Sequence, residues 1–429
     1  MKVLIIGGGG REHALAWKAI QSPLVNMVYV APGNGGTATE PAIVNLGIDS
    51  EDIESLVAFA RDNSIGLTIV GPEGPLVAGV ADAFQAAGLP CFGPVSGAAQ
   101  LEGSKAFTKD FLARHHIPTA AYGTFTELEP ALAYLQEVGA PIVVKADGLA
   151  AGKGVILADD LATAEQAVRD MLSDGCFGAA GNRVVIEEYL RGEEASFIAI
   201  VGGGQILPMA SSQDHKARDD GDRGPNTGGM GAYSPAPVVT PEIHTRIMAE
   251  VIRPTVEGLA AEGLPYTGFL YAGLMIGPDG TPKVLEYNCR FGDPETQPIL
   301  MRLRSDLVAL CLAALESRLD QVEAEWDQRA ALGVVMAAGG YPGAYEKGNP
   351  IGGLDEASAL QDCKVFHAGT SLVDGEVLTN GGRVLCATAL GNGVSDAQSL
   401  AYALIDKIGW KGAFFRSDIG YRAVARERN

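Results

Sequence analysis

Residues 283–290 have the sequence KVLEYNCR, in which apolar and polar side chains alternate. Side chains two positions apart on a β-strand point to the same face of the sheet. The pattern therefore predicts a strand whose core face carries Leu285, Tyr287 and Cys289. The opposite face carries three polar side chains, those of Glu286, Asn288 and Arg290.

The polar face of this strand is the sharpest chemical signal in the sequence. A carboxylate and an amide oxygen at this spacing suit Mg²⁺ or Mn²⁺, with phosphate oxygens completing the coordination. We therefore predict Glu286 and Asn288 as metal ligands, and Arg290 as a group that neutralises a phosphoryl group or a carboxylate. An ordinary amphipathic edge strand is the alternative, because such alternation is common.

Upstream, a glycine loop joins two predicted strands, PIVVKAD and VILA. Gly148 to Gly154 is not a P-loop, because only three residues separate Gly148 from Gly152 and Lys153, and no Ser or Thr follows. A glycine hairpin can close over phosphates as a lid, although a plain flexible hairpin is the alternative. Lys145 lies in an otherwise apolar strand, where an unpaired ammonium is costly, so we expect it to face a bound anion.

Further polar residues accompany this loop. Glu187 and Glu194 would be unremarkable solvated carboxylates alone, but beside a phosphate lid they become candidates for contacts with ribose and adenine. A long polar segment over residues 211–231 is either functional or disordered, because structureless loops of this length are uncommon. We expect His215 within it to be solvated, as lone histidines in polar loops usually are.

The first hundred residues alternate short buried strands (3–6, 27–30 and 67–70) with helical patterns, which predicts a doubly wound parallel sheet. Loops at residues 7–10, 32–36 and 71–75 should then share one rim of the sheet. The sequence GGGGREH at 7–13 fails as a dinucleotide fingerprint, since Glu12 or His13 occupies the third glycine position. Its bare N–H groups at a helix N-terminus can bind a phosphate, and a tight structural turn is the alternative.

Composition sets the broad class. The 429 residues carry a net charge of −20, with 47% hydrophobic and 20% charged residues, which predicts a globular protein of three or four domains. So acidic a chain disfavours nucleic acid and anionic membranes as partners. Six scattered cysteines, no signal peptide and no apolar run longer than residues 307–315 predict a cytoplasmic protein.

With these residues considered together, the chain resembles the phosphoribosylamine–glycine ligase family of ATP-grasp enzymes over essentially its whole length. The most specific motif is RFGDPETQ at 290–297, and the segments 7–13, 32–36, 71–75, 214–216 and 226–231 also fit the family. On the strand at 271–276, many ATP-grasp enzymes carry another acidic metal ligand, whereas this chain has Gly273 and Leu274.

The resemblance implies a multidomain α/β and α+β fold. It comprises an N-terminal doubly wound domain (1–103), a central ATP-grasp domain (104–122 and 191–327), a lid (123–190) and a small mixed C-terminal domain (328–429). It also implies that a monomer joins glycine to 5-phosphoribosylamine with ATP, through glycyl phosphate, to form glycinamide ribonucleotide in purine biosynthesis.

The resemblance further assigns roles to individual residues. Arg290, Lys216 and Asp214 would be catalytic. ATP would be bound by Lys105, Lys145, Gly152, Lys153, Glu187, Leu190 and Glu194. The other substrates would be bound by Gly8, Gly9, Gly10, Glu73, Asn226, Thr227, Gly228 and Gly229. Three alternatives stay open: another ATP-grasp ligase or carboxylase, a nucleotide-binding regulator without turnover, and, more remotely, a dehydrogenase.

Overall fold

The computed structural model describes residues 1–148, 154–173 and 182–428. Its N-terminal part is a five-stranded parallel sheet in the order β3-β2-β1-β4-β5, as the alternating pattern predicted. The strands are β1 (Lys2–Gly7), β2 (Met27–Pro32), β3 (Ile43–Asn45), β4 (Leu67–Val70) and β5 (Cys91–Phe92). The helices are α1 (Gly10–Ala19), α2 (Ile53–Asp62), α3 (Glu73–Val77), α4 (Val80–Ala86) and α5 (Ser96–Gly103).

The three glycine loops of this sheet lie along one rim, as expected for the carboxyl ends of parallel strands. The N–H of Gly33 donates to the carbonyl of Gly7 at 3.2 Å, and the N–H of Gly71 donates to the carbonyl of Ile6 at 2.9 Å. The side chain of Asn34 also donates to the carbonyls of Gly8 and Gly9. These bonds confirm the predicted rim.

The central sheet is antiparallel, in the order β11-β10-β16-β17. Its strands are β10 (Glu193–Gly202), β11 (Gln205–Pro208), β16 (Gly268–Ile276) and β17 (Pro282–Asn288). Its helices are α6 (Lys105–Arg114), α9 (Pro241–Ile247), α10 (Arg253–Ala261), α11 (Thr296–Arg302) and α12 (Leu307–Leu315), with a π-helical turn at Met248–Ile252 and a 3₁₀ turn at Leu319–Gln321. The helix expected from Glu102 onward is interrupted, because Ser104 caps α6 by accepting the N–H of Phe107.

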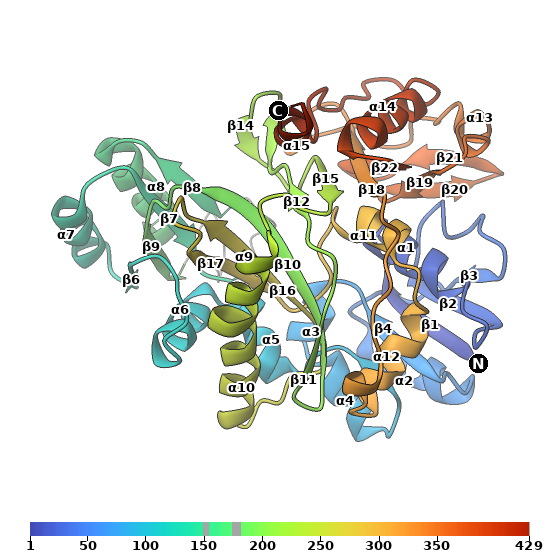
Figure 1. The fold of residues 1–429 in the computed structure, drawn as a ribbon, viewed down its shortest axis with the longest axis horizontal. Helices are drawn as coiled ribbons and strands as arrows, with labels where there is room; N and C mark the ends of the chain where they lie inside the picture. The colour runs from blue at the N-terminus through green and yellow to red at the C-terminus, as the bar shows by residue number, and fades with distance from the viewer. Residues whose placement is uncertain (149–153, 174–181, 429) are drawn as a thin grey trace.

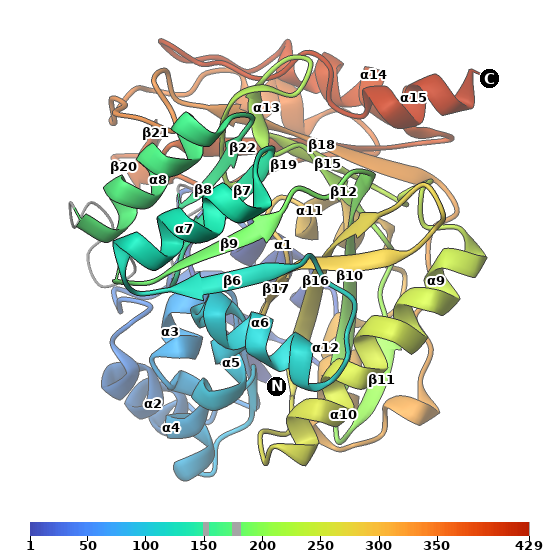
Figure 2. The same cartoon turned by 90° about the vertical axis from the view of Figure 1, so that its left-hand side faces the viewer.

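A four-stranded sheet, β6-β9-β7-β8, stands beside the central sheet as the lid. It comprises β6 (Tyr122–Phe125), β7 (Ile142–Ala146), β8 (Val155–Ala158) and β9 (Val184–Glu188), with α7 (Leu128–Val138) and α8 (Leu161–Ser173). Both helices lie on the outer side of this sheet, away from the rest of the molecule (Figure 1, Figure 2). The lid has its own buried cluster, centred on Leu135, Val144 and Ile186, so it can pack as a separate unit.

The C-terminal part lies above the N-terminal sheet (Figure 1). Its main sheet has the order β12-β15-β18-β22-β19, with separate hairpins β13–β14 and β20–β21. The strands are β12 (Gln213–Asp214), β13 (Ala217–Asp219), β14 (Arg223–Asn226), β15 (Gly231–Ser234), β18 (Ala330–Ala337), β19 (Cys363–His367), β20 (Thr370–Val373), β21 (Glu376–Thr379) and β22 (Arg383–Gly391). The helices are α13 (Leu354–Ser358), α14 (Val394–Ile405) and α15 (Tyr421–Glu427).

The long polar segment at 211–231 is therefore structured, because β12 and β15 pair with each other and β15 pairs with β18. Two strands from the middle of the chain thus extend the C-terminal sheet. None of the helices in the described part of the chain is long and apolar enough to cross a membrane.

Candidate active site

A cavity of about 630 Å³ lies where the lid, the central sheet, the N-terminal rim and the C-terminal part meet. Its wall includes Lys105 at the start of α6, Lys145 on the lid, and Glu286, Asn288 and Arg290 at the end of β17. Asp214, Lys216 and residues 226–228 approach from the segment between β12 and β15. The structure thus brings most of the predicted site residues into one space.

The strand β17 forms the floor of the cavity and contains a β-bulge. Gly273 of β16 pairs with Glu286, but the next residue, Leu274, pairs with Val284, so Leu285 has no opposite partner. The prediction that Leu285 faces the core is wrong, because the extra residue shifts the alternation and Leu285 lines the cavity. Tyr287 and Cys289 are buried as predicted.

Glu286 and Lys216 form an ion pair in this cavity. The ammonium of Lys216 lies 3.2 Å from Oε1 of Glu286 and 3.1 Å from Oε2 of Glu194. Lys216 lowers the pKa of Glu286 to about 2, against the opposing effect of burial, so the carboxylate is ionised near neutral pH. A Cβ at Gly273 would lie 3.1 Å from Cγ of Glu286, so a second acid at that position would crowd this carboxylate.

Asp214 differs from Glu286 although both line the same cavity. Burial raises the pKa of Asp214 to about 8; Lys216 opposes this shift, and the neighbouring carboxylates of Glu295 and Glu194 add to it. Burial opposes protonation of Lys216, but the carboxylates of Glu194, Glu286 and Asp214 raise its pKa well above the ordinary value. This end of the cavity therefore holds excess negative charge, which suits a cationic group such as an ammonium.

The guanidinium of Arg290 is held by two carboxylates. It lies 2.8 Å from Glu102 and 3.2 Å from Glu73. Burial opposes ionisation of Glu73, but Arg290 and Arg11 hold its pKa at about 2. Arg290 is thus fixed in direction at the cavity wall.

Glu102 also sets the orientation of Asn288. Its carboxylate accepts the side-chain N–H of Asn288 at 2.8 Å and the backbone N–H of Cys289 at 2.7 Å. These bonds engage the amide nitrogen of Asn288, so the two branches of its side-chain amide are distinguished. The nitrogen lies at Glu102, and the oxygen is on the other branch. The sequence analysis did not identify Glu102, because the carboxylate lies 187 residues before Cys289 and belongs to no motif.

The lid contributes a buried charge cluster. Glu187 lies 3.0 Å from the ammonium groups of both Lys109 and Lys145, and Lys145 also donates to the carbonyl of Leu285 at 3.1 Å. Lys145, which we expect to face a bound anion, thus also has a protein carboxylate beside it, because β9 places Glu187 next to it in the lid sheet. Lys109 was not identified in the sequence, where it appears as one polar residue of an amphipathic helix.

Three further nucleotide candidates line the same cavity. Lys105 donates to the carbonyl of Gly148 at 2.7 Å, and burial lowers its pKa. Leu190, which follows β9, and the half-buried carboxylate of Glu194 also line the cavity. The predicted residues Gly152 and Lys153 lie outside the described residues.

The predicted phosphate loop is tightly packed against its neighbours. The N–H of Gly9 donates to Oε2 of Glu12 at 2.5 Å, so this group already has an anionic partner. A Cβ at Gly8 would lie 2.6 Å from the carbonyl oxygen of Gly33, and one at Gly10 would lie 2.7 Å from Nε2 of Gln297. These close approaches explain why glycine is needed here.

Residues 226–228 form the wall of the cavity near the C-terminal part, and Gly229, which packs against Pro294, is outside the lining. Thr227 donates its N–H to the carbonyl of Lys216 at 2.8 Å, and Gly228 donates its N–H to the hydroxyl of Tyr341 at 3.0 Å. Arg383 donates to the carbonyl of Gly228 and forms an ion pair with Asp293 at 3.1 Å. Arg383 was missed in the sequence because it belongs to β22, far along the chain from this wall.

The protein donors for a metal ion are few. Within residues 1–148, 154–173 and 182–428, no three His, Cys, Asp or Glu side chains form a group that could hold a metal ion. Glu286 and Asn288 offer an ionised carboxylate and an amide oxygen, a donor set that fits a hard cation completed by phosphate oxygens.

Solved structures share this architecture. The crystal structure of phosphoribosylamine–glycine ligase from Thermotoga maritima superposes with a TM-score of 0.84 at 34% identity, covering 98% of this chain and all of that one. A biotin carboxylase from Campylobacter jejuni, at 13% identity, has a TM-score of 0.73 and covers 96% of this chain and 92% of its own. At that identity the second similarity concerns the fold alone.

Sequence relatives agree over the full length. The phosphoribosylamine–glycine ligase of Allochromatium vinosum is 74% identical over 429 residues, and that of Vibrio parahaemolyticus is 69% identical over 428, each covering 100% of both chains. Family models of phosphoribosylglycinamide synthetase match residues 1–102 (N domain), 103–296 (ATP-grasp domain) and 331–422 (C domain).

A lid sheet facing a central sheet across a cavity of lysines and carboxylates, together with the ATP-grasp family model, defines the class: the chain is an ATP-grasp ligase. Enzymes of this class require divalent metal ions and act on small molecules. Within that class, the chain belongs to the phosphoribosylglycinamide synthetase family. The resemblance inferred from the sequence motifs is confirmed.

Proposed function

We propose that this ligase joins glycine to 5-phosphoribosylamine, converts ATP to ADP and phosphate, and forms glycinamide ribonucleotide in de novo purine biosynthesis. The observation that carries the proposal is the position of Glu286, Asn288 and Arg290 in one cavity with Lys105 and Lys145. The residues at the end of β17 suit metal-bound phosphates and a carboxylate, and the lysines suit phosphate oxygens.

The reaction has two steps. A carboxylate oxygen of glycine attacks the γ-phosphorus of ATP, and the bond from that phosphorus to the β-phosphate oxygen breaks. The products of this step are glycyl phosphate and ADP. The amine of 5-phosphoribosylamine then attacks the acyl carbon, the bond between that carbon and the phosphate oxygen breaks, inorganic phosphate leaves, and the amine nitrogen loses a proton. The residues supply positioning and charge in both steps.

ATP is assigned to the space between lid and central sheet. Lys105 and Lys145 would contact its phosphates, with Gly152 and Lys153 of the glycine loop above them. Leu190 and Glu194 would contact adenine and ribose. Glu187 supports this assignment because it forms ion pairs with the ammonium groups of Lys109 and Lys145.

Mg²⁺ or Mn²⁺ is assigned to Glu286 and Asn288. When bound there, the ion would neutralise the charge that develops on the transferring phosphoryl group. The low pKa of Glu286 supports the assignment, because the carboxylate needs no proton release to act as a ligand. Glu102 holds the amide of Asn288 and the guanidinium of Arg290 in fixed directions.

Glycine is assigned to the space between Arg290 and Asp214. Arg290 would align its carboxylate, and Asp214, in the carboxylate-rich end of the cavity, would receive its ammonium group. That ammonium would favour ionised Asp214, against the burial that raises its pKa. Lys216, which stays protonated beside Glu194 and Glu286, would stabilise the negative charge of the phosphoryl group.

The acceptor 5-phosphoribosylamine is assigned to the N-terminal side. Gly8, Gly9 and Gly10 would approach its phosphate, and Glu73 would face the sugar. Asn226, Thr227 and Gly228, on the cavity wall near the C-terminal part, would complete this site together with Gly229. Closure of the lid would exclude water, which otherwise hydrolyses acyl phosphates.

The test is ADP release by the purified chain with ATP, Mg²⁺ and 5-phosphoribosylamine, with one amino acid added at a time. We expect release that depends on glycine, and glycinamide ribonucleotide as product by mass spectrometry. Release that depends on another carboxylate would indicate a different ATP-grasp ligase. Absence of release with every combination would indicate a nucleotide-binding regulator.

The domain division at 1–103, 104–122 with 191–327, 123–190 and 328–429 belongs to the same proposal. Separate buried clusters in the lid and in the C-terminal part support it, although β12 and β15 extend the C-terminal sheet. A monomeric state is also proposed, and light scattering after size exclusion tests it. Metal titrations comparing Mg²⁺ with Mn²⁺ test the preference between the ions.

A further inference from the structure

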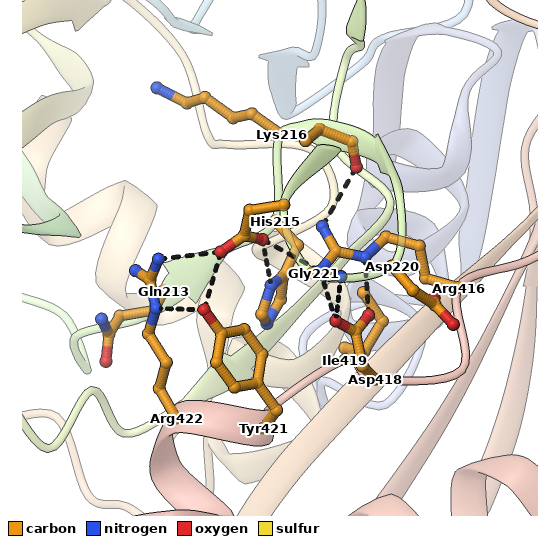
Figure 3. A network of polar contacts seen from close by, with 12 residues as sticks. Gln213, His215, Lys216, Asp220, Gly221, Arg416, Asp418, Ile419, Tyr421 and Arg422 are labelled. Carbon is orange, nitrogen blue, oxygen red and sulfur yellow. Dashed lines mark hydrogen bonds and ion pairs between the residues drawn. The ribbon is translucent and has the colours of Figure 1, made fainter. Parts of the chain in front are cut away.

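The strand β12 and the residues after it have two chemically different sides. Asp214 and Lys216 line the cavity, whereas His215, between them, is 5% exposed and faces the C-terminal part. This follows from the alternation of side chains in extended chain. The expectation that His215 is solvated is wrong, because the C-terminal part packs over it. Figure 3 shows the long side chain of Lys216 leading away from the cluster that surrounds His215.

The segment 416–422 of the C-terminal part contacts the side chain of His215. The N–H of Gly420 donates to Nε2 of His215 at 2.9 Å, so this nitrogen is an acceptor and the ring is neutral. Nδ1 lies 3.6 Å from Asp222, which also accepts from the hydroxyl of Tyr421 at 2.8 Å. Burial lowers the pKa of His215, which keeps the ring in the accepting form.

A buried arginine ties the same loop to the same segment. The side chain of Arg416 is fully buried, and it donates to the carbonyl of Ala217 at 3.1 Å. It pairs with Asp222 at 2.9 Å and with Asp418 at 2.8 Å. A buried guanidinium is tolerated only when its donors are satisfied, so this cluster specifies one position of the loop relative to the C-terminal part.

The backbone on the cavity side leaves little freedom to the same residues. The N–H of His215 donates to the carbonyl of Gly231, and its carbonyl accepts the N–H of Met230. The carbonyl of Lys216 accepts the N–H of Thr227. A displacement of the His215 backbone would therefore also displace its two neighbours, whose side chains lie in the cavity.

We propose that the C-terminal segment 416–422 is a positioning element of the active site. It acts through His215, the positioning residue, to hold Asp214 and Lys216 toward the substrates. This inference rests on the proposed roles of Asp214 and Lys216. It gives the C-terminal part a function in glycine activation.

The experiment compares His215→Phe, which keeps a ring but no polar atom, with His215→Gln, whose amide oxygen can accept the N–H of Gly420. We expect His215→Phe to lower kcat/KM for glycine by about 10- to 100-fold, the scale of a displacement of roughly 1 Å in a catalytic group. KM for ATP should change less than about threefold, because no ATP-binding residue is displaced. His215→Gln should recover most of the loss.

A double-mutant cycle with Lys216→Ala identifies the route of the effect. If His215 acts through Lys216, His215→Phe should lower kcat/KM for glycine by less than about threefold in the Lys216→Ala background. The reason is that the effects of coupled residues are non-additive. His244→Phe is the matched control, because His244 on α9 packs against Phe197 at 5.1 Å and lies outside the cluster. We expect wild-type kinetics from it.

Three results would overturn the inference: wild-type kcat/KM for glycine in His215→Phe, equal losses for glycine and ATP without recovery in His215→Gln, or full additivity with Lys216→Ala. Failure of the underlying function is distinguishable from these. It would appear as unchanged turnover in Lys216→Ala itself, or as no glycine-dependent ADP release by the wild-type chain.

Discussion

At the scale of single residues, neighbouring charges decide how each carboxylate in the cavity behaves. Glu286 and Asp214 share Lys216, yet the pKa of one falls to about 2 while that of the other rises to about 8. Glu286 contacts the ammonium directly at 3.2 Å, whereas desolvation dominates at Asp214. The first is therefore prepared for a metal ion, and the second for a cationic ligand.

Glu286→Ala should lower turnover by at least about 10²-fold, the scale at which loss of one electrostatic element slows a transition state. The measurement is glycine-dependent ADP release at limiting Mg²⁺. Glu250→Ala is the control, because Glu250 pairs with Arg246 on the surface outside the cavity. Near-normal turnover of the Glu286 variant at limiting Mg²⁺ would reject the metal assignment.

Glu102→Gln should weaken the apparent affinity for Mg²⁺ by about 10- to 100-fold, because groups that orient a metal ligand contribute at that scale. The amide loses the charge that pairs with Arg290 and can no longer accept all the N–H groups that Glu102 binds. Titration of ADP release with Mg²⁺ measures the shift. Glu262→Gln, which alters a pair with Arg114, should leave the titration unchanged.

At the scale of elements, the contact between α1 and β19 joins the N-terminal and C-terminal parts. His13 on α1 accepts the N–H of His367 at 2.8 Å and lies 3.2 Å from Glu40, which also pairs with Lys364. Burial, with His13 and Lys364 nearby, lowers the pKa of His367 to about 3. Bonds from His13 and Lys364 outweigh burial and lower the pKa of Glu40 to about 2.

These shifts predict acid sensitivity at this contact. Unfolded histidine takes up a proton near pH 6.5, whereas folded His367 does so only near pH 3, so its stabilising effect is lost as the pH falls between these values. Glu40 acts in the same direction between about pH 4.5 and 2. The urea concentration at the midpoint of unfolding should fall as the pH is lowered from 7 to 4. It should fall less steeply in His367→Asn than in the wild-type chain. Equal slopes in the two proteins would contradict this.

At the scale of the whole molecule, the lid meets the remainder through charged contacts at the cavity. Lys145 reaches the carbonyl of Leu285, Lys105 reaches that of Gly148, and Lys283 pairs with Glu188 at 3.4 Å. A nucleotide seated between the lid and the central sheet would add contacts to both. Its binding energy would therefore appear as stability of the whole chain.

MgATP at about 100 times its dissociation constant should stabilise the fold by about 2.7 kcal/mol and raise Tm, because it binds only the folded state. Lys145→Ala should show a much smaller shift at the same concentration. Lys411→Ala, which alters an exposed pair with Glu346, should retain the wild-type shift. Differential scanning fluorimetry at matched concentrations makes the comparison. An equal shift in the Lys145 variant would exclude this lysine from nucleotide binding.

The sequence by itself determined the features that depend on local pattern. Alternating strands and helices predicted the N-terminal parallel sheet, and the period of two in KVLEYNCR placed Glu286, Asn288 and Arg290 together at the cavity. The motif RFGDPETQ indicated the family. These properties depend only on residues that are close together in the sequence, because strand geometry repeats over a few residues.

Only the tertiary structure decided which distant groups meet. The bulge that turns Leu285 into the cavity depends on pairing with β16, and Glu187 reaches Lys145 only across the lid sheet. Glu102 at Asn288 and Gly420 at His215 are contacts across 186 and 205 residues. Burial and partner charges, which set direction and pKa, arise from such contacts, and no period in the sequence encodes them.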